Sequence, residues 1–405
     1  MSMDTTKPYY KKTIQYTFGN QNLNFLVSQE LFSSQDIDLG TQRLLRTLLF
    51  EKIDSFDKAL DLGCGYGPIG IVLKKICPQA KVHMVDRDAL ALSYARANAE
   101  ANNVSDNLKI YGSLGYDSVA DTDFDLIVSN IPAKVGEQVL THILKDARHH
   151  VRKNGKVVIV VIDAIAEYIE QQLKSDDSIE ITYHRSWPGH HVYHYRFKPE
   201  SADLNTSIEP AFESGTYTRQ QNQCTFKNVS FALTTTFHLR EFDSVSYDTK
   251  LLLSHLGAVK GTAKSVLIFN PGQGYIPLAI TYAFQGAQIV LVDRDLQALQ
   301  ISRENLIRNK CDAEKILLFH QVGIDVSKNE FDVIVGILPD KQNLEVYKMY
   351  IEQARAQLVS GGKLILCSSS TVITRVEELA AEDAQFRLIG REKKKGYSVI
   401  SFHRS

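Results

Sequence analysis

The sequence predicts an α/β fold made of two tandem Rossmann-like domains, and three observations lead to that prediction. Val85-Asp86-Arg87-Asp88 returns as Val292-Asp293-Arg294-Asp295, a shift of 207 residues. The same shift, without a gap, pairs glycines, asparagines, aspartates and prolines of the two copies: Gly65 with Gly272, Asn98 with Asn305, Asn102 with Asn309, Asp125 with Asp332, Pro132 with Pro339 and Gly155 with Gly362. In the first copy, apolar runs of strand length alternate with helical patterns, as in a mostly parallel sheet flanked by helices.

The repeat defines the domain organisation. We predict a first domain at residues 1–198, a linker at 199–214 and a second domain at 215–405. The linker is polar and carries two prolines, which is typical of a connecting segment. A stretch rich in Thr, Phe, Asn and Val opens each copy, at 13–28 and 224–239, and each is expected to add a small β extension to its sheet.

Each element of the first domain follows from its local pattern. Short apolar runs predict strands at 58–62, 81–85, 108–111, 124–129 and 156–162. Helices are expected at 69–76, 89–102, 137–151 and 164–173, the second of them rich in Ala and Arg. Ligands of such sheets bind beyond the carboxyl ends of the strands, so functional residues should follow the strands directly.

The overall composition is that of an ordinary globular protein. Hydrophobic residues make up 44% of the chain, charged residues 23%, and the net charge is −1. These values exclude disorder and a strongly basic nucleic-acid binder, so RNA contacts would depend on local patches such as 7–12, 149–153 and 391–395.

The cysteines and apolar runs bear on location. Five scattered cysteines without a Cys-x-x-Cys pair favour a reducing cytoplasm. No apolar run approaches about 18 residues, so no membrane segment is expected. The histidines at 190–194 have no carboxylate or cysteine spaced to complete a metal site, and no metal is predicted.

A glycine loop follows the first strand. Gly63, Gly65 and Gly67 alternate after Asp61, which lets the backbone turn tightly and approach a ligand closely. Asp86 ends the second strand, where a carboxylate can accept hydrogen bonds from two ribose hydroxyls. Dinucleotide-binding folds share both features, so the loop by itself indicates only a nucleotide-containing ligand.

Two further features separate these possibilities. Asp61 stands before the glycines, where it suits a ligand with an ammonium group better than a pyrophosphate. The fourth strand ends in Ser129-Asn130-Ile131-Pro132, which nicotinamide enzymes do not need. With these motifs the sequence resembles the class I S-adenosylmethionine-dependent methyltransferases. More narrowly, it is similar to the ribosomal RNA guanine methyltransferases built as two tandem copies, a resemblance that covers both halves and includes residues 32–41.

The resemblance implies S-adenosylmethionine as the cofactor and a role for each residue around it. Asp61 and Gly63 would face its methionine end, and Gly65 and Gly67 would form the floor of the site. Asp86 would hold the ribose, and Ser113 would lie near the adenine.

The acceptor loop is the second predicted site. An exocyclic amine is a poor nucleophile, and the amide oxygen of Asn130 with a nearby backbone carbonyl would accept its two N–H bonds while holding it at attack distance. Pro132 fixes φ and helps to orient that carbonyl. The family pattern is Asn-Pro-Pro-Phe or Asn-Pro-Pro-Tyr, whereas this chain has Ile131 and Ala133 at the first proline and the aromatic.

Ala133 cannot stack on a flipped base. Three alternatives stay open: another aromatic replaces the missing ring, with Tyr66, Phe32 or Trp187 as candidates; the acceptor is not a flipped guanine; or activity has been lost.

The second copy has lost the site residues. Asp61, Gly63, Asn130 and Ala133 become Ile268, Asn270, Ile337 and Asp340, although Asp293 persists. We therefore expect the second domain to bind substrate or support the structure, without productive cofactor binding or catalysis. In the resembling tandem enzymes the active copy is the second, whereas here the first carries the motifs.

The predicted function is methylation of an exocyclic amine of ribosomal RNA, with ribosomal RNA or the ribosomal subunit as partner. Alternatives are a methyltransferase for a small molecule or a protein, a non-catalytic cofactor-binding or assembly protein, and another nucleotide-binding enzyme. The sequence leaves the oligomeric state open.

Overall fold

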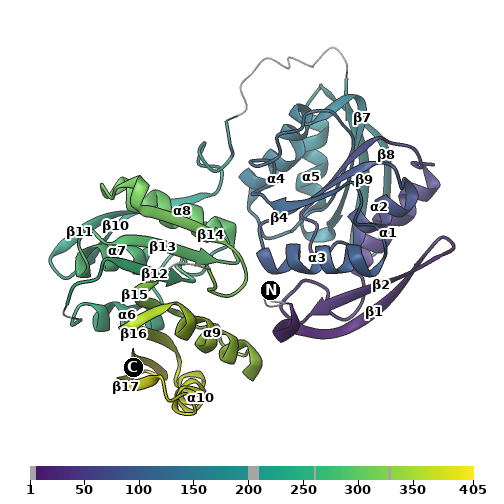
Figure 1. The fold of residues 1–405 in the computed structure, drawn as a ribbon. Helices are drawn as coiled ribbons and strands as arrows, with labels where there is room; N and C mark the ends of the chain where they lie inside the picture. The colour runs from purple at the N-terminus through teal and green to yellow at the C-terminus, as the bar shows by residue number, and fades with distance from the viewer. Residues whose placement is uncertain (1–5, 199–208, 260, 327–329) are drawn as a thin grey trace. The chain divides into compact units, whose positions relative to one another are not determined.

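The computed structural model describes residues 6–198, 209–259, 261–326 and 330–405. They form two compact units, Tyr9–Tyr217 and Thr218–Ser405, the latter together with the described residues before Tyr9 (Figure 1). Part of the predicted linker, 199–208, lies outside the described residues. The remainder, 209–214, belongs to the first unit.

Contacts with the loop after the fifth strand attach this last segment to the first unit. The backbone N–H groups of Ala211 and Phe212 donate to the two carboxylate oxygens of Asp117, at 2.7 and 3.0 Å. Tyr217 is buried, and its hydroxyl lies 3.2 Å from the place that a Cβ on Gly115 would take.

The first domain contains a seven-stranded sheet in the order β5-β4-β3-β6-β7-β9-β8. The strands are β3 (Lys58–Leu62), β4 (Lys81–Asp86), β5 (Leu108–Gly112), β6 (Phe124–Asn130), β7 (Val151–Ile162), β8 (Ile179–Trp187) and β9 (His190–Phe197). The strands β5, β4, β3, β6 and β7 run parallel to one another, whereas β9 is antiparallel to its neighbours β7 and β8. The strand order reverses between β3 and β6, the position at which open α/β sheets bind ligands.

Helices lie on both sides of this sheet (Figure 1). They are α1 (Leu39–Phe50), α2 (Pro68–Ile76), α3 (Ala89–Ala101), α4 (Glu137–Lys145) and α5 (Asp163–Ser175). The prediction of a helix at 137–151 was wrong beyond Lys145. A 3₁₀ turn, Asp146–His149, follows, and Val151 then pairs with Phe124 of β6, so sheet pairing overrides the helical pattern there.

The N-terminal β extension is a separate two-stranded sheet of β1 (Tyr10–Phe18) and β2 (Gln21–Ser28). The expectation that it joins the main sheet was wrong. Its backbone pairs instead with side-chain amides of α3 and the residue after it, because Leu26 N donates to Asn98 Oδ1 at 2.7 Å and Asn24 N to Asn102 Oδ1 at 3.0 Å.

The second domain repeats this architecture with the sheet order β14-β13-β12-β15-β16-β18-β17, which confirms the predicted fold class. Its hairpin is again separate, with β10 (Thr218–Phe226) and β11 (Val229–Thr236). The other strands are β12 (Ser265–Phe269), β13 (Gln288–Asp293), β14 (Ile316–His320), β15 (Phe331–Ile337), β16 (Leu358–Ser369), β17 (Phe386–Lys394) and β18 (Tyr397–Arg404). The helices are α6 (Tyr247–Leu256), α7 (Tyr275–Ala283), α8 (Leu296–Arg308), α9 (Leu344–Gln357) and α10 (Ser370–Ala381).

Residues that the two copies share hold equivalent parts of the scaffold. Thr234 N donates to Asn305 at 2.8 Å, so an asparagine again fixes the hairpin to a helix. Asp125 accepts from Lys58 N at 2.7 Å, and Asp332 accepts from Ser265 N at 3.0 Å. The internal repeat therefore reflects structural hydrogen bonds as well as the sheet itself.

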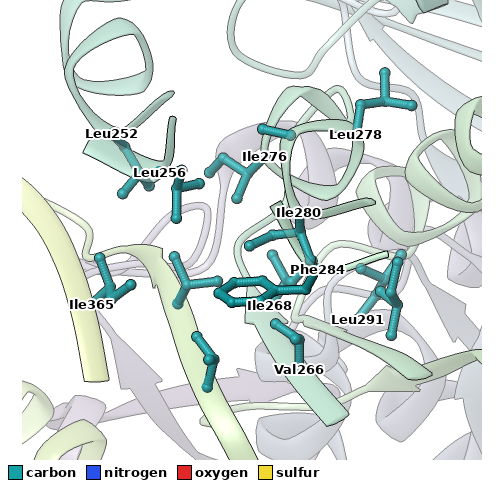
Figure 2. Close-up of a cluster of buried hydrophobic side chains, with 14 of the residues drawn as sticks. Leu252, Leu256, Val266, Ile268, Ile276, Leu278, Ile280, Phe284, Leu291 and Ile365 are labelled. Atoms are coloured by element: carbon teal, nitrogen blue, oxygen red, sulfur yellow. The ribbon is translucent and has the colours of Figure 1, made fainter. Parts of the chain in front are cut away.

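An apolar cluster fills one face of the second sheet (Figure 2). Val266 and Ile268 of β12 lie in it with Ile276, Ile280 and Phe284 of the α7 region. Ile337, at the end of β15, belongs to the same cluster. In the parts of the chain that the structure describes, no helix has both the length and the apolar character to cross a bilayer.

Candidate functional site

The glycine loop of the first domain adopts left-handed backbone geometry at all three predicted glycines. Gly63, Gly65 and Gly67 have φ values of 76°, 54° and 96°. A Cβ on Gly67 would lie 2.7 Å from Met84 Cε, so this glycine allows the loop to pack on β4. A Cβ on Gly63 or Gly65 would meet no atom within 4 Å, so the loop leaves open space at these two positions.

Asp61 is fully buried behind this loop. Its Oδ2 accepts from Gly70 N at 2.7 Å, whereas Oδ1 has no hydrogen-bond partner among the described residues. Burial raises the pKa of this carboxyl to about 7. A buried carboxylate oxygen without a donor fits a ligand that brings an ammonium group.

Asp86 ends β4 next to the loop. Its two oxygens accept from Gly65 N and Asp88 N, both at 2.9 Å, and burial raises its pKa to about 6. Each carboxylate oxygen has a second lone pair, so the group can still accept from ribose hydroxyls. Ser113 N donates to Asp86 O at 3.1 Å, which places the predicted adenine position beside the predicted ribose position.

The hydroxyl of Ser113 is used within its own turn. It donates to Gly115 O at 2.8 Å and accepts from Ser118 N at 3.0 Å. The side chain therefore shapes the loop after β5, and its backbone faces the β4 end.

Asn130 ends β6 in a fixed orientation. Its Nδ2 donates to Asp38 Oδ2 at 2.9 Å and to Thr41 Oγ1 at 3.0 Å. A carboxylate only accepts hydrogen bonds, so the amide nitrogen must face Asp38 and the amide oxygen must face away from it. Asn130 thereby presents an acceptor for an N–H donor.

Asp38 is a site residue that the sequence analysis did not single out. The same Oδ2 accepts from Thr41 N at 3.1 Å, so Asp38 caps α1 and orients Asn130 at once. An aspartate directly before a helical pattern indicates the cap, but no local signal pairs it with a residue 92 positions away.

After Asn130, one more backbone hydrogen bond continues the pairing with β7, from Ile131 N to Val160 O at 3.0 Å. Ile131 is buried, and its side chain anchors the start of the loop. Pro132 follows in the exposed part and Ala133 is half-buried, so the loop offers a backbone turn without a ring.

The structure separates the three aromatic candidates. Tyr66 is only 3% exposed and packs edge-on against Phe25, so it cannot stack on a base as it stands. Phe32 is 73% exposed and lies on the segment that leads to Asp38. Trp187 is half-buried at the end of β8, and the guanidinium carbons of Arg43 and Arg185 lie 6.0 and 4.8 Å from its ring centre.

The second copy keeps the shape of the loop but changes its chemistry. Asn270 stands at the position of Gly63 with φ of 48°, and Gly272 and Gly274 have φ of 59° and 97°. Asn270 Nδ2 donates to Ile337 O at 2.8 Å, across the ends of β12 and β15. The carboxylate of Asp61 is replaced by Ile268 in the apolar cluster, which offers nothing to an ammonium.

The histidines after β8 make pairwise contacts. His194 Nε2 lies 2.7 Å from Thr47 Oγ1, and His190 Nδ1 lies 2.7 Å from Arg43. Across the described ranges, no group of three or more His, Cys, Asp or Glu side chains is arranged to hold a metal ion.

Comparison with known proteins gives results of three kinds. The family model described as "Methyltransferase small domain" matches residues 22–176 and 232–401. "Uncharacterized protein YbxB" of Bacillus subtilis is 31% identical over 37% of the chain and 74% of its own length. "Ribosomal RNA small subunit methyltransferase C" of Haemophilus influenzae is 34% identical over 38% of the chain and 47% of its own length, so the chain spans about half of that relative.

Among solved structures, "T. Thermophilus 16S rRNA N2 G1207 methyltransferase (RsmC) in complex with AdoMet and Guanosine" matches 97% of the chain and 98% of its own length. The TM-score is 0.64 at 18% identity. This likeness concerns the fold, and it covers both domains.

Proposed function

We propose, from the premise that the chain belongs to the methyltransferase small domain family, that its first domain methylates an exocyclic amine of ribosomal RNA, of the guanine type. Membership in this family confirms the predicted enzyme class and the predicted S-adenosylmethionine cofactor. The acceptor, its partners and the role of each residue are part of the proposal.

The observation that carries the proposal is the orientation of Asn130. Asp38 and Thr41 hold its Nδ2, which leaves Oδ1 for the substrate. An oxygen acceptor is what an amine donor requires, and a fixed acceptor holds the nitrogen with its lone pair directed at the methyl group. The Asn130 side chain need not move when the substrate amine binds, because its amide is already oriented in the free chain.

The residues of the glycine loop fit the cofactor. Asp61 Oδ1 would accept from its ammonium group, Gly63 and Gly65 would give it room, Gly67 would complete the floor, and Asp86 would hold its ribose. When bound, S-adenosylmethionine supplies an electrophilic methyl group on a sulfonium. Asp61 would hold the amino-acid end of the cofactor, and the turn around Ser113 would border its adenine.

Phe32 supports a base as the acceptor. The loop at Ala133 has no ring, and Phe32 is the exposed aromatic on the segment that ends at Asp38, the residue bonded to Asn130. Stacking on such a ring stabilises a base outside its helix by about 1–3 kcal/mol. Relatives named as ribosomal RNA methyltransferases point to the same acceptor class.

The second domain completes the proposal as a substrate-binding or structural domain. Ile268 and Asn270 remove the cofactor contacts, while the scaffold is kept. The cytoplasm, where ribosomal RNA is found, is the proposed location.

The test is mass spectrometry of nucleosides from ribosomal RNA of source cells with and without the gene. We expect one methylated nucleoside to disappear in the deletion strain, to return with the wild-type gene and to stay absent with Asn130→Ala. Unchanged methylated nucleosides would contradict the proposal and favour a small-molecule or protein acceptor.

A further inference from the structure

We propose that Arg43, Arg185 and Trp187 form a platform that binds single-stranded RNA beside the acceptor asparagine. This arginine–tryptophan platform rests on the proposed function, because it gives the RNA that flanks the methylated base a place to bind. Four properties of the surface support the inference: its cation–aromatic contacts, its free charge, its connection to Asn130 through His190 and Asp38, and its absence from the second domain.

Guanidinium groups and aromatic rings contact one another in the platform. The Arg185 guanidinium carbon lies 4.8 Å from the Trp187 ring centre and 5.5 Å from that of Phe50, and the Arg43 carbon lies 6.0 Å from Trp187. Arg185 and Phe50 are exposed, at the end of the edge strand β8 and of α1. Single-stranded nucleic acids stack their bases on such planes.

The two arginines keep their charge available. Other arginines of this domain pair with carboxylates, such as Arg148 with Asp176 and Arg196 with Glu180 at 2.9 Å. Among the described residues, no carboxylate oxygen lies within 4.0 Å of Arg43 or Arg185. An unpaired guanidinium can bind phosphate through two N–H groups, and the chain, with a net charge of −1, needs such local sites to bind RNA.

A short series of contacts joins the platform to the acceptor asparagine. Arg43 Nη1 lies 2.7 Å from His190 Nδ1 and donates to Pro188 O at 2.7 Å. A Cβ on Gly40 would lie 2.7 Å from His190 Cδ2 and 2.8 Å from Asp38 Oδ2, so the imidazole and the carboxylate flank this glycine. Asp38 in turn holds Asn130.

The second domain does not repeat the platform. At the 207-residue shift, Arg185 corresponds to Glu392, Trp187 to Lys394 and His190 to Tyr397. The strands themselves coincide, because β8 and β17 begin and end at the same shift. Arg43 corresponds to Lys250, and the ammonium groups of Lys250 and Lys395 lie 5.6 and 4.3 Å from the ring centre of Tyr247. The second domain thus joins its last hairpin to its first helix through lysines and a tyrosine. The pairing of arginines with tryptophan occurs in the domain that carries Asp61 and Asn130.

The test uses Trp187, the one tryptophan in the sequence, as its reporter. We expect a guanine-free single-stranded RNA oligonucleotide to quench the tryptophan emission of the full chain, in wild type and in Asn130→Ala. Without guanine, binding does not depend on the acceptor pocket. Arg185→Ala should raise the Kd for the oligonucleotide about tenfold, measured by fluorescence anisotropy of labelled RNA.

Two controls distinguish stacking from charge. Lys393→Ala removes one positive charge from an exposed position on β17, the counterpart of β8, and should change the Kd by less than twofold. Trp187→Ala should weaken binding as Arg185→Ala does, and Trp187→Phe should restore most of it. Circular dichroism checks that each variant is folded.

The outcomes separate this inference from the proposed function. An unquenched emission together with an unchanged Kd in Arg185→Ala would overturn the platform. Quenching by an acidic polyglutamate peptide but not by RNA would also overturn it, and would assign the surface to a protein partner. If RNA binds at the platform and the nucleosides of ribosomal RNA are unchanged by gene deletion, the platform stands and the proposed function fails.

Discussion

The two domains share one scaffold and differ in the residues at the ends of their strands. Asp88 and Asp295 cap equivalent helices, and Asn98 and Asn305 fix equivalent hairpins. The carboxylate of Asp61, in contrast, has an apolar counterpart. Residues such as these, repeated in both domains, hold the fold, whereas chemistry depends on a few positions that the fold does not require.

The glycine loop illustrates how shape can persist without ligand contacts. Asn270 takes the left-handed conformation of Gly63, which asparagine tolerates better than most residues. Its side chain then bonds to the end of β15. A loop of the right shape is therefore insufficient to identify a cofactor site. The side chain before the loop, a carboxylate in the first domain and an apolar group in the second, distinguishes the two cases.

The largest expected effect contrasts the two asparagines. Asn130→Ala should reduce methyl transfer about 10²- to 10³-fold, because it removes the oriented oxygen acceptor. Asn270→Ala is the same substitution at the strand ends of the second domain, at the position that corresponds to Gly63, and it should leave the rate within twofold. Single-turnover rates on ribosomal RNA with saturating cofactor measure both. Equal losses in the two variants would contradict the specific acceptor role of Asn130.

Asp61→Asn should weaken S-adenosylmethionine binding about ten- to hundredfold, because the ammonium loses a charged acceptor. Calorimetric titration measures this Kd. The same variant should raise the melting temperature of the cofactor-free chain at pH 8. Folding raises the pKa of this carboxyl to about 7, so its ionised form costs stability above that pH and the neutral amide does not.

Ile268→Asp makes the reverse change and provides the control for Asp61→Asn. It places a carboxylate in the apolar cluster and should lower the melting temperature without creating a second cofactor site. A second binding event in the titration would contradict the view that Ile268 and Asn270 have together abolished binding.

Phe32→Ala tests the aromatic that replaces the family ring. We expect the KM for ribosomal RNA to rise about tenfold, since base stacking is lost, with little change in cofactor Kd. Phe32→Tyr should restore the KM. Tyr282→Ala, at an exposed aromatic of the second domain, is the matched control and should have no effect. If Phe32→Ala left the KM unchanged, the acceptor would have to be held without this ring.

The smallest expected effect is a pH dependence specific to the first domain. Protonated Asp61 has lost the negative charge that attracts an ammonium and keeps only part of its acceptor capacity, and burial raises its pKa to about 7. The Kd for S-adenosylmethionine should therefore rise about fourfold as the pH falls from 8 to 6.5. Asp61→Asn should bind weakly with little dependence on pH over this range. A slope of the same size in that variant would assign the titration to another group.

Much of the fold could be predicted from the sequence because its signals are local or repeated. The shift of 207 residues indicated two copies of one fold, and apolar runs located β3, β4 and β6 within a residue or two. The glycine loop could be predicted because alternating glycines after a strand indicate a tight turn in which the backbone adopts positive φ values.

The errors and omissions involve contacts between distant residues. The end of α4 depends on β7 pairing with β6, and the separate hairpins depend on amides of α3 and α8. The bond between Asp38 and Asn130 spans 92 positions. The burial of Tyr66 follows from its contact with Phe25 on β2, which no local pattern reveals.

The contacts of Asp117 with Ala211 and Phe212 have a practical consequence for the smallest part of the chain that folds by itself. A first domain cut at residue 198, where its last strand has just ended, would lose the donors that this carboxylate binds and would uncover the loop behind Ser113. A fragment that ends at Tyr217 keeps them. The gene segment for independent expression of the first domain should therefore extend to codon 217, well past Phe197, where the last strand of the sheet ends.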